Sequence, residues 1–537
     1  MKRKLAVTTA VAVVALASGG WLLQRQGAPE ASVYQQARLF EDVLDHVADD
    51  YVDSIDTGKL YQMAIDGMLD QLHDPYSVFL KRDDFRALNE QISGDYGGFG
   101  FQFDIVGGWV TVIAPLPDTP AERAGLQTGD VITAVDGQST QGWNNDQALK
   151  NMRGQAGTSA TLTVKRTGVD RPMPMKITRA NIHVNSVLAA VMLDDRVGYV
   201  QTSVVSRSLA SDLANAIAEL QKQGMKSLIL DLRGNPGGSL EEGIAASDLF
   251  LDPGQEVVQT RGRMPGSTND YKDGRPQQWP SLPIVILTNG GTASAAEIIT
   301  GALQDHDRAV VVGTPTFGKG LVQSVWPLTS ETALKLTTGR WYTPSGRTIQ
   351  RVAKNEAEHE AQVMATDLGK DTVKLDSSLI FHTDHGRVVY GGGGIRPDIY
   401  ITPDTFTTAE RNFNKALGSS FPVFRDVLST YSLELRDQKL IPNPNFTVTS
   451  GMVDEVLRRL KGRNVVLADS LIAGARNLIG QDLADDIEIY SFGRAAEVKR
   501  RVGEDRQVQK ALDLAHRARS PQDLLSLATT APGANRN

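Results

Sequence analysis

The sequence predicts an α/β fold, because buried-strand patterns alternate with helical patterns through the middle of the chain. Three apolar runs, at residues 227–232, 282–287 and 309–312, each lead into a turn that contains glycine. A helical pattern, 293–303, lies between the last two runs. A right-handed crossover makes such strands parallel, so all three turns should meet at the carboxyl edge of one sheet, where α/β proteins place their sites.

Two residues with complementary chemistry follow the second and third runs. Ser294 lies in Gly-Gly-Thr-Ala-Ser-Ala-Ala-Glu, and Lys319 lies in Thr-Phe-Gly-Lys-Gly. A serine hydroxyl becomes a nucleophile when a base takes its proton, and lysine is such a base once burial lowers its pKa. Alone, Ser294 is typical of a helix cap and Lys319 of a solvated side chain. Together at one sheet edge, they indicate a catalytic pair.

The first run supplies further candidates through the segment Arg-Gly-Asn-Pro-Gly-Gly. Its last residues, Gly237 and Gly238, let the backbone approach a ligand and turn N–H groups toward a developing oxyanion. Gln323 lies four residues after Lys319 on a strand pattern, so both side chains should share a face, and the glutamine could hold the lysine amine. An exposed polar residue on a strand explains Gln323 equally well.

Other readings of these residues are weaker. His306 and Asp305 lie at the far end of the same predicted helix, about 18 Å from Ser294 at 1.5 Å per residue, so Asp305 is interpreted as structural. The run from Gly313 to Gly320 nearly matches a phosphate-binding loop. However, Gly320 stands where that loop needs a hydroxyl, and a strand pattern follows where it needs a helix. Nucleotide binding is therefore disfavoured.

Composition limits the remaining classes. At about 150 residues per domain, 537 residues correspond to three or four domains. The net charge is -7, with no basic tract after the first few residues, which argues against nucleic acid as a partner. Cysteine is absent, so disulfides and thiolate metal sites are excluded. His382 and His385 lack further ligands, so no metal and no cofactor are expected.

The first residues are typical of an export signal. Lys2-Arg3-Lys4 precedes an apolar stretch at 5–23 that is just long enough to span a bilayer. Ala15-Leu16-Ala17 resembles a cleavage site, whereas Trp21-Leu22-Leu23 suits an uncleaved membrane anchor. We therefore expect an exported protein, in the bacterial periplasm or at the outer face of the inner membrane.

Two further regions precede the α/β core. Apolar residues at helical spacing over 33–73, broken at Asp56-Thr57-Gly58, predict a helical pair for packing or dimerisation. Residues 85–166 predict a small β-rich domain with helices at 119–126 and 145–152.

A further helical region follows the α/β core. Helical patterns return after Thr402, for example at 452–461 and 508–520.

Several long motifs, in the right order between Phe40 and Ile401, resemble the carboxy-terminal processing peptidases, also called tail-specific proteases. The motifs are Leu-Ile-Leu-Asp-Leu-Arg-Gly-Asn-Pro-Gly-Gly (228–238), Thr-Ala-Ser-Ala-Ala-Glu-Ile (292–298), Gly-Ala-Leu-Gln-Asp (301–305), Thr-Phe-Gly-Lys-Gly (316–320), Trp-Tyr-Thr-Pro-Ser-Gly-Arg-Thr-Ile-Gln (341–350) and Gly-Gly-Gly-Ile-Arg-Pro-Asp (392–398). Residues 121–132 resemble part of a PDZ domain. Thr292 and Tyr76 depart from the family pattern without touching the chemistry.

The resemblance implies a serine endopeptidase of the Ser/Lys type. It implies Ser294 as nucleophile, Lys319 as general base and Gln323 as the residue that orients the lysine. The N–H of Ala295 and one from Gly237 or Gly238 would form the oxyanion hole. A PDZ domain binds an extended peptide at a sheet edge and holds its carboxylate on loop N–H groups. Here the resemblance assigns that loop to Gly97, Gly98, Phe99, Gly100 and Phe101.

The expected architecture is an α/β (α+β multidomain) chain. By resemblance, it has a crotonase/ClpP-like peptidase core, an inserted β-rich PDZ domain and flanking helical segments. The expected segments are a signal or anchor at 1–25, helices at 30–83, PDZ at 84–170, peptidase core at 175–402 and C-terminal helices at 403–537. Expected partners are proteins with exposed, apolar C-termini. A homo-oligomer and an activating adaptor protein stay open, whereas the intact Ser294, Lys319 and Gln323 argue against a silent PDZ scaffold.

Overall fold

The computed structural model describes residues 33–353, 355–369 and 377–530. The chain divides into two units, Met1–Phe79 and Leu80–Asn537. In the first unit, the expected helical pair is present as α2 (Val33–Asp50) and α3 (Thr57–Asp70). Asp56 caps α3 by accepting a hydrogen bond from the N–H of Lys59. Leu44 is the one buried residue of α2. A short strand, β1 (Val78–Leu80), ends at the first residue of the second unit.

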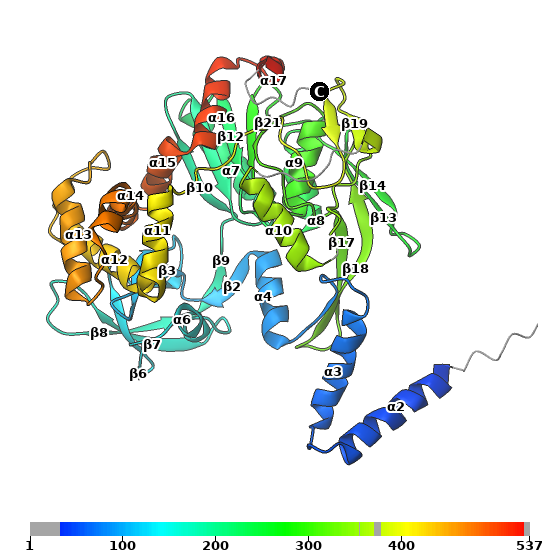
Figure 1. Cartoon of the computed structure of the whole chain (residues 1–537), viewed down its shortest axis with the longest axis horizontal. Helices are drawn as coiled ribbons and strands as arrows, with labels where there is room; N and C mark the ends of the chain where they lie inside the picture. Colours follow the sequence, from blue (N-terminus) through cyan, green and yellow to red (C-terminus); the bar gives the residue numbers. More distant parts are fainter. Residues whose placement is uncertain (1–32, 354, 370–376, 531–537) are drawn as a thin grey trace, which may run out of the picture. The chain divides into compact units, whose positions relative to one another are not determined.

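A six-stranded sheet forms the centre of the second unit (Figure 1). Its strands, in spatial order, are β10 (Val187–Met192), β11 (Val197–Thr202), β12 (Ser227–Asp231), β15 (Ile284–Thr288), β16 (Val310–Gly313) and β21 (Ile399–Tyr400). All neighbours are parallel except the pair β10 and β11. The expected parallel arrangement of the three apolar runs is therefore confirmed. Strands β12 and β15 are buried at every residue, because helices cover both faces.

Two sets of helices make those faces. One core contains apolar residues of α7 (Leu209–Lys222), α8 (Leu240–Asp248) and α9 (Ala295–Asp305). The other contains residues of α15 (Arg494–Glu504), α16 (Arg506–Arg517) and α17 (Pro521–Thr530). The last three helices, α15 to α17, thus cover one face of the central sheet.

A second, antiparallel sheet lies beside α9. It contains β17 (Leu321–Pro327), β18 (Ala333–Tyr342), β13 (Glu256–Gly262) and β14 (Asn269–Lys272). The sequence predicted only β17 of this sheet, because the other strands have mixed polar and apolar residues. The same part of the chain contains α10 (Glu356–Asp367), the turn η1 (Ser377–Leu379) and the hairpin of β19 (Ile380–His382) and β20 (Val388–Tyr390).

The β-rich domain has its own core. One sheet runs in the order β3 (Phe101–Val106), β4 (Trp109–Pro115), β5 (Val131–Val135), β7 (Ser159–Lys165) and β8 (Met173–Thr178), with β6 (Gln138–Ser139) on β5. Helices α5 (Pro120–Arg123) and α6 (Asn145–Met152) pack on it. Helix α4 (Arg82–Ser93) precedes it, and β2 (Asp95–Gly98) pairs with β9 (Ala180–His183).

A helical cluster follows the last strand of the central sheet in the sequence and precedes α15. It contains α11 (Thr408–Leu417), η2 (Gly418–Ser420), α12 (Phe421–Asp437), α13 (Ser450–Gly462) and α14 (Asp469–Phe492). Their apolar faces form a separate core that includes Phe413, Phe424 and Ile479. Helix α12 also contacts the β-rich domain, where the N–H of Gly107 donates to Asp426.

Candidate functional site

The turns after β12, β15 and β16 meet at one edge of the central sheet and are hydrogen-bonded to one another. The Thr292 hydroxyl donates to the carbonyl of Leu232 at 2.9 Å, and the Ala293 N–H donates to the carbonyl of Asn235 at 2.9 Å. The Phe317 N–H donates to the carbonyl of Thr292, also at 2.9 Å. The juxtaposition expected from the sequence is therefore confirmed at the level of the backbone.

Ser294 stands at the sharp bend between β15 and α9. Its φ is +53° and its ψ is −120°, a conformation that an L-residue adopts only under strain. It occupies the position before the first residue of α9, and its side chain is half-buried. Strained backbone of this kind concentrates at functional positions, where the surrounding structure maintains it.

The carboxylate of Glu297 holds this bend to the turn of the lysine. Glu297 is fully buried and accepts hydrogen bonds from the N–H groups of Ser294 (2.7 Å), Gly318 (2.7 Å) and Lys319 (3.0 Å) and from the Thr316 hydroxyl. Burial raises the pKa of Glu297, whereas these four hydrogen bonds favour its ionised form. One carboxylate therefore fixes the backbones of both candidate catalytic residues.

The role of Glu297 was not predicted from the sequence, although a signal was present. Ser-x-x-Glu is the spacing of a capping box, in which the glutamate side chain returns to the N–H of the cap residue. The additional bonds to residues 316–319 depend on the fold and have no local signal.

Lys319 is fixed from its other side as well. The indole Nε1 of Trp341 donates to the carbonyl of Lys319 at 3.0 Å, and the side chain of Lys319 is half-buried. Lys319 precedes β17, and the pairing of β17 with β18 shifts register between Val322 and Gln323. The extra residue at this shift is Thr338 of β18, so β17 itself continues without an insertion, and the orienting role of Gln323 stays a prediction. A strand follows the lysine, so the helix that a phosphate-binding loop needs is absent at this position.

The glycines after β12 lie directly against Ser294. A Cβ atom on Gly237, whose φ is +87°, would be 2.7 Å from the N of Ala295 and 2.8 Å from the Cβ of Ser294. The N–H of Gly237 donates to Asn235 Oδ1 at 2.9 Å. Within the described residues, the N–H groups of Gly238 and Ala295 have no hydrogen-bond acceptor. They are therefore the candidate oxyanion donors at this sheet edge.

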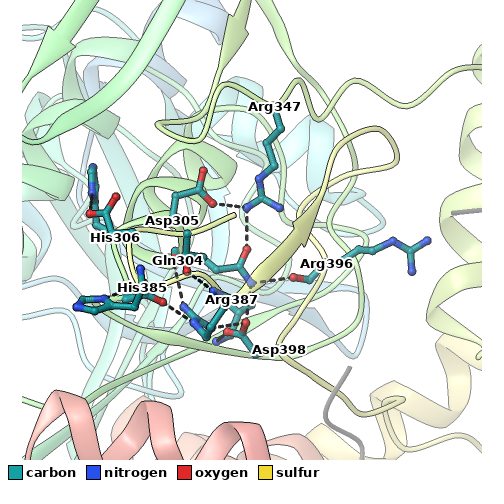
Figure 2. A network of polar contacts seen from close by, with 12 residues as sticks. Gln304, Asp305, His306, Arg347, His385, Arg387, Arg396 and Asp398 are labelled. Atoms are coloured by element: carbon teal, nitrogen blue, oxygen red, sulfur yellow. Dashed lines mark hydrogen bonds and ion pairs between the residues drawn. The ribbon is translucent and has the colours of Figure 1, made fainter. Parts of the chain in front are cut away.

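The opposite end of α9 is a network of ion pairs (Figure 2). Asp305 pairs with Arg347 at 2.7 Å, and both side chains are completely buried. Arg347 also donates to Gln304, whose amide donates to the Arg396 carbonyl at 2.9 Å. His306 bonds the Glu256 carbonyl and Asp384, each at 2.7 Å. Asp305 and His306 thus serve this network rather than Ser294.

The remaining expectations concern metals and membranes. His385 pairs with Asp307 at 2.9 Å, and the described residues contain no group of three or more His, Cys, Asp or Glu side chains that could hold a metal ion. No helix in the described part of the chain is long and apolar enough to cross a membrane. The predicted apolar segment at 5–23 lies outside the described residues.

The expected carboxylate loop of the β-rich domain is short. Gly97 and Gly98 lie in β2, opposite Asn181 and Ala180, and Phe101 begins β3, so only Phe99 and Gly100 form the turn. Strand β3 is at the edge of its sheet. A cavity of about 1170 Å³ borders Gly97, and it is lined in part by Leu149, Lys150 and Arg153.

Three family models match parts of the chain. Residues 196–356 match Peptidase family S41, residues 111–166 match a PDZ domain, and residues 20–84 match the N-terminal domain of the activating protease CtpB. A carboxy-terminal-processing protease of Bartonella bacilliformis is 40% identical over 327 residues, which cover 60% of this chain and 74% of that protein.

Two further relatives are more distant. A probable CtpA-like serine protease of Staphylococcus haemolyticus is 36% identical over 59% of this chain and 63% of its own length. The solved photosystem II D1 C-terminal processing protease is 29% identical over 57% of this chain and 83% of its own, with a TM-score of 0.32. The sequence matches to the peptidase and PDZ families establish the class: the chain belongs to the carboxy-terminal processing serine peptidases of family S41 and has a PDZ domain.

Proposed function

We propose that this protein is an exported endopeptidase that cleaves proteins near their C-termini with Ser294 as nucleophile and Lys319 as general base. The observation that carries the proposal is the Glu297 carboxylate, which bonds the N–H groups of both residues and thereby fixes their turns together. A strained serine at the start of a helix supports the same assignment, as do the N–H groups of Gly238 and Ala295, which have no acceptor in the described part of the chain.

In the proposed mechanism, the neutral amine of Lys319 takes the proton of the Ser294 hydroxyl as its Oγ attacks the scissile carbonyl. The N–H groups of Ala295 and Gly238 stabilise the resulting oxyanion. The lysine ammonium then protonates the leaving amine, and an acyl-enzyme remains on Ser294. Water, deprotonated by Lys319, hydrolyses that ester. Gln323 orients the amine in this scheme.

The PDZ domain is proposed to capture the substrate C-terminus. Strand β3 is an edge strand, so an extended peptide can add to it, and the turn at Phe99 and Gly100 lies where its carboxylate would end. The basic side chain of Lys150 lines the adjoining cavity and favours an anionic terminus, whereas Arg153 beside it already pairs with Glu90. We expect substrates whose C-terminal residues are apolar, since Leu149 is exposed in the same cavity.

The location and assembly of the protein are part of the proposal. The basic residues at 2–4 followed by the apolar stretch at 5–23 support export to the periplasm or the outer face of the inner membrane. In the first unit, Tyr34, Leu39, Phe40 and Val43 are exposed on α2, which supports pairing with a second copy or an adaptor. Fractionation of cells that express the chain tests the location.

The catalytic proposal is tested by incubating the full chain with an unstructured protein that ends in apolar residues, followed by intact-mass analysis. Ser294→Ala should abolish cleavage, by a factor on the order of 10⁴ or more, without a change in thermal stability. Ser211→Ala, an exposed serine on α7, is the matched control. Turnover by Ser294→Ala would overturn the assignment of the nucleophile, and an inactive wild type that binds tail peptides would favour a scaffold. Replacing the apolar tail with a charged one should slow wild-type cleavage.

A further inference from the structure

One side chain from the C-terminal helices reaches the segment that carries the oxyanion donors. We call this segment, Arg233–Gly238, the glycine loop. The Nη1 of Arg233 donates to Asp505 Oδ2 at 2.6 Å and to Gln507 Oε1 at 2.8 Å. Asp505 is 272 residues further along the chain and lies beyond the residues that match Peptidase family S41.

Arg233 is held from its other side by the strand that leads into the glycine loop. Its Nη2 donates to Asp231 Oδ2 at 2.6 Å, and its Nε donates to both oxygens of that carboxylate at 3.0 Å. The Tyr199 hydroxyl donates to Asp231 at 2.6 Å. Burial lowers the pKa of Arg233, but the Asp231 carboxylate more than offsets this and keeps the pKa above its ordinary value. The guanidinium is therefore a charged link between β12 and the C-terminal helices.

Asp505 is itself a fixed point. Its Oδ1 caps α16 by accepting from the N–H groups of Gln507 (2.8 Å) and Val508 (3.0 Å), which leaves Oδ2 for Arg233. Helix α16 packs on the central sheet, and the Ser227 hydroxyl of β12 donates to the Ala515 carbonyl at 2.9 Å. The helix that positions Asp505 is therefore anchored on the same strand that leads into the glycine loop.

Hydrogen bonds already hold the middle of the glycine loop, from the N–H of Gly234 to Asn289 and from the N–H of Gly237 to Asn235, and the Arg233 link adds a restraint at its start. Gly234 and Gly237 have φ values of +70° and +87°, and glycine gives a backbone more freedom than any other residue. An oxyanion donor is effective only when it is held in place before the reaction, because reorganisation during the reaction reduces its contribution.

We propose that Asp505 is a positioning residue for catalysis: acting through Arg233, it fixes the glycine loop so that the Gly238 N–H points at the oxyanion. The inference rests on the proposed function and deepens it, since it assigns a catalytic task to the C-terminal helices. The contact acts on the transition state rather than on substrate binding, so it should affect kcat and leave KM unchanged.

The test separates the link to Arg233 from the helix cap. Asp505→Asn keeps a cap acceptor, and its amide NH₂ then faces a guanidinium that cannot accept a hydrogen bond. Asp505→Ser also caps but does not reach Arg233. For both variants of the full chain we expect kcat to fall by about 10- to 100-fold with KM and melting temperature nearly unchanged. Asp454→Asn breaks a 2.7 Å ion pair with Arg476 between α13 and α14 and should change neither constant.

Two further readouts exclude a merely structural role. In an Arg233→Ala background, Asp505→Asn should have no additional effect on kcat, whereas a capping defect would persist. Amide hydrogen exchange at residues 234–238 should be faster in Asp505→Asn than in wild type. If Asp505→Asn has the kcat and the amide exchange rates of wild type while Ser294→Ala is inactive, this inference is overturned and the proposed function stands. Turnover by Ser294→Ala would instead overturn the proposed function, and this inference with it.

Discussion

The two ends of helix α9 differ. Before its first residue stands a serine with a φ of +53°, and the nearby N–H groups of Gly238 and Ala295 have no acceptor among the described residues. At its last residue, Asp305 pairs with a completely buried Arg347 (Figure 2). At the last residue, both oxygens of Asp305 are occupied, one by Arg347 and one by the Ser345 N–H. The first end keeps hydrogen-bonding capacity for a substrate, whereas the last end uses it within the protein. The same helix therefore positions the chemistry at one end and is stabilised at the other.

The difference between the two ends of α9 should be largest when the proposed base, Lys319, is replaced. Lys319→Arg keeps a long basic side chain, but arginine stays protonated and cannot take the serine proton. We expect cleavage to fall by a factor on the order of 10⁴, with the melting temperature unchanged. Lys222→Arg, which keeps an exposed ion pair with Glu219, should be fully active. An active Lys319→Arg enzyme would rule out a neutral lysine base.

Two glycines of the same loop separate backbone strain from access to the oxyanion. A Cβ on Gly237 would collide with the turn of Ser294, whereas one on Gly234 meets no atom within 4 Å, although both residues have positive φ. We expect kcat to fall by about 10²- to 10³-fold in Gly237→Ala and far less in Gly234→Ala. Equal losses in steady-state assays would mean that strain, rather than the oxyanion site, sets the effect.

The far end of α9 should respond in stability instead. Asp305→Ala leaves the guanidinium of Arg347 buried without its partner, which costs about 3–5 kcal/mol of unfolding free energy. The double variant Asp305→Leu, Arg347→Met should lose less unfolding free energy than Asp305→Ala, because it leaves no unpaired charge buried. Urea unfolding measures both. The activity that remains per folded molecule should match wild type, and a selective loss of kcat would place Asp305 in the chemistry.

The smallest expected effect concerns pH. Burial raises the pKa of Asp307, but Arg387 more than offsets this, so the pKa lies below its ordinary value of 3.8. The folded protein then binds fewer protons, and the contribution of Asp307 is present above pH 3.8 and lost as the pH falls through its folded-state pKa. In thermal unfolding, Asp307→Asn should be less stable than wild type at pH 6, and the gap should close in acid. A constant gap would contradict this origin.

Much of the peptidase core could be predicted from the sequence. Strands β12, β15 and β16 are short, uniformly apolar runs, and α9 begins two residues after the expected start because Ser294 has the cap position. The right-handed crossover then gives the shared edge. Strands β13, β14 and β18 were missed, since strands with one exposed face and mixed composition lack a distinct pattern.

The partners of buried charges could not be predicted. Arg347 finds Asp305 42 residues away, and Arg233 finds Asp505 272 residues away, so neither pair has a local pattern. Glu297 was visible as part of a motif, but its bonds to the lysine turn exist only after β15, α9 and β16 have folded together. Side-chain networks that join distant segments depend on the tertiary structure.

The most direct test of the proposed chemistry is to trap the covalent intermediate. Wild-type full chain is mixed with an excess of substrate protein that has an apolar C-terminus, quenched in acid during turnover and digested for mass spectrometry. A peptidyl ester on Ser294, absent from Ser294→Ala, is the expected result. Turnover with an adduct on another residue, or cleavage by Ser294→Ala, would contradict the assignment of Ser294 and the division of labour along α9.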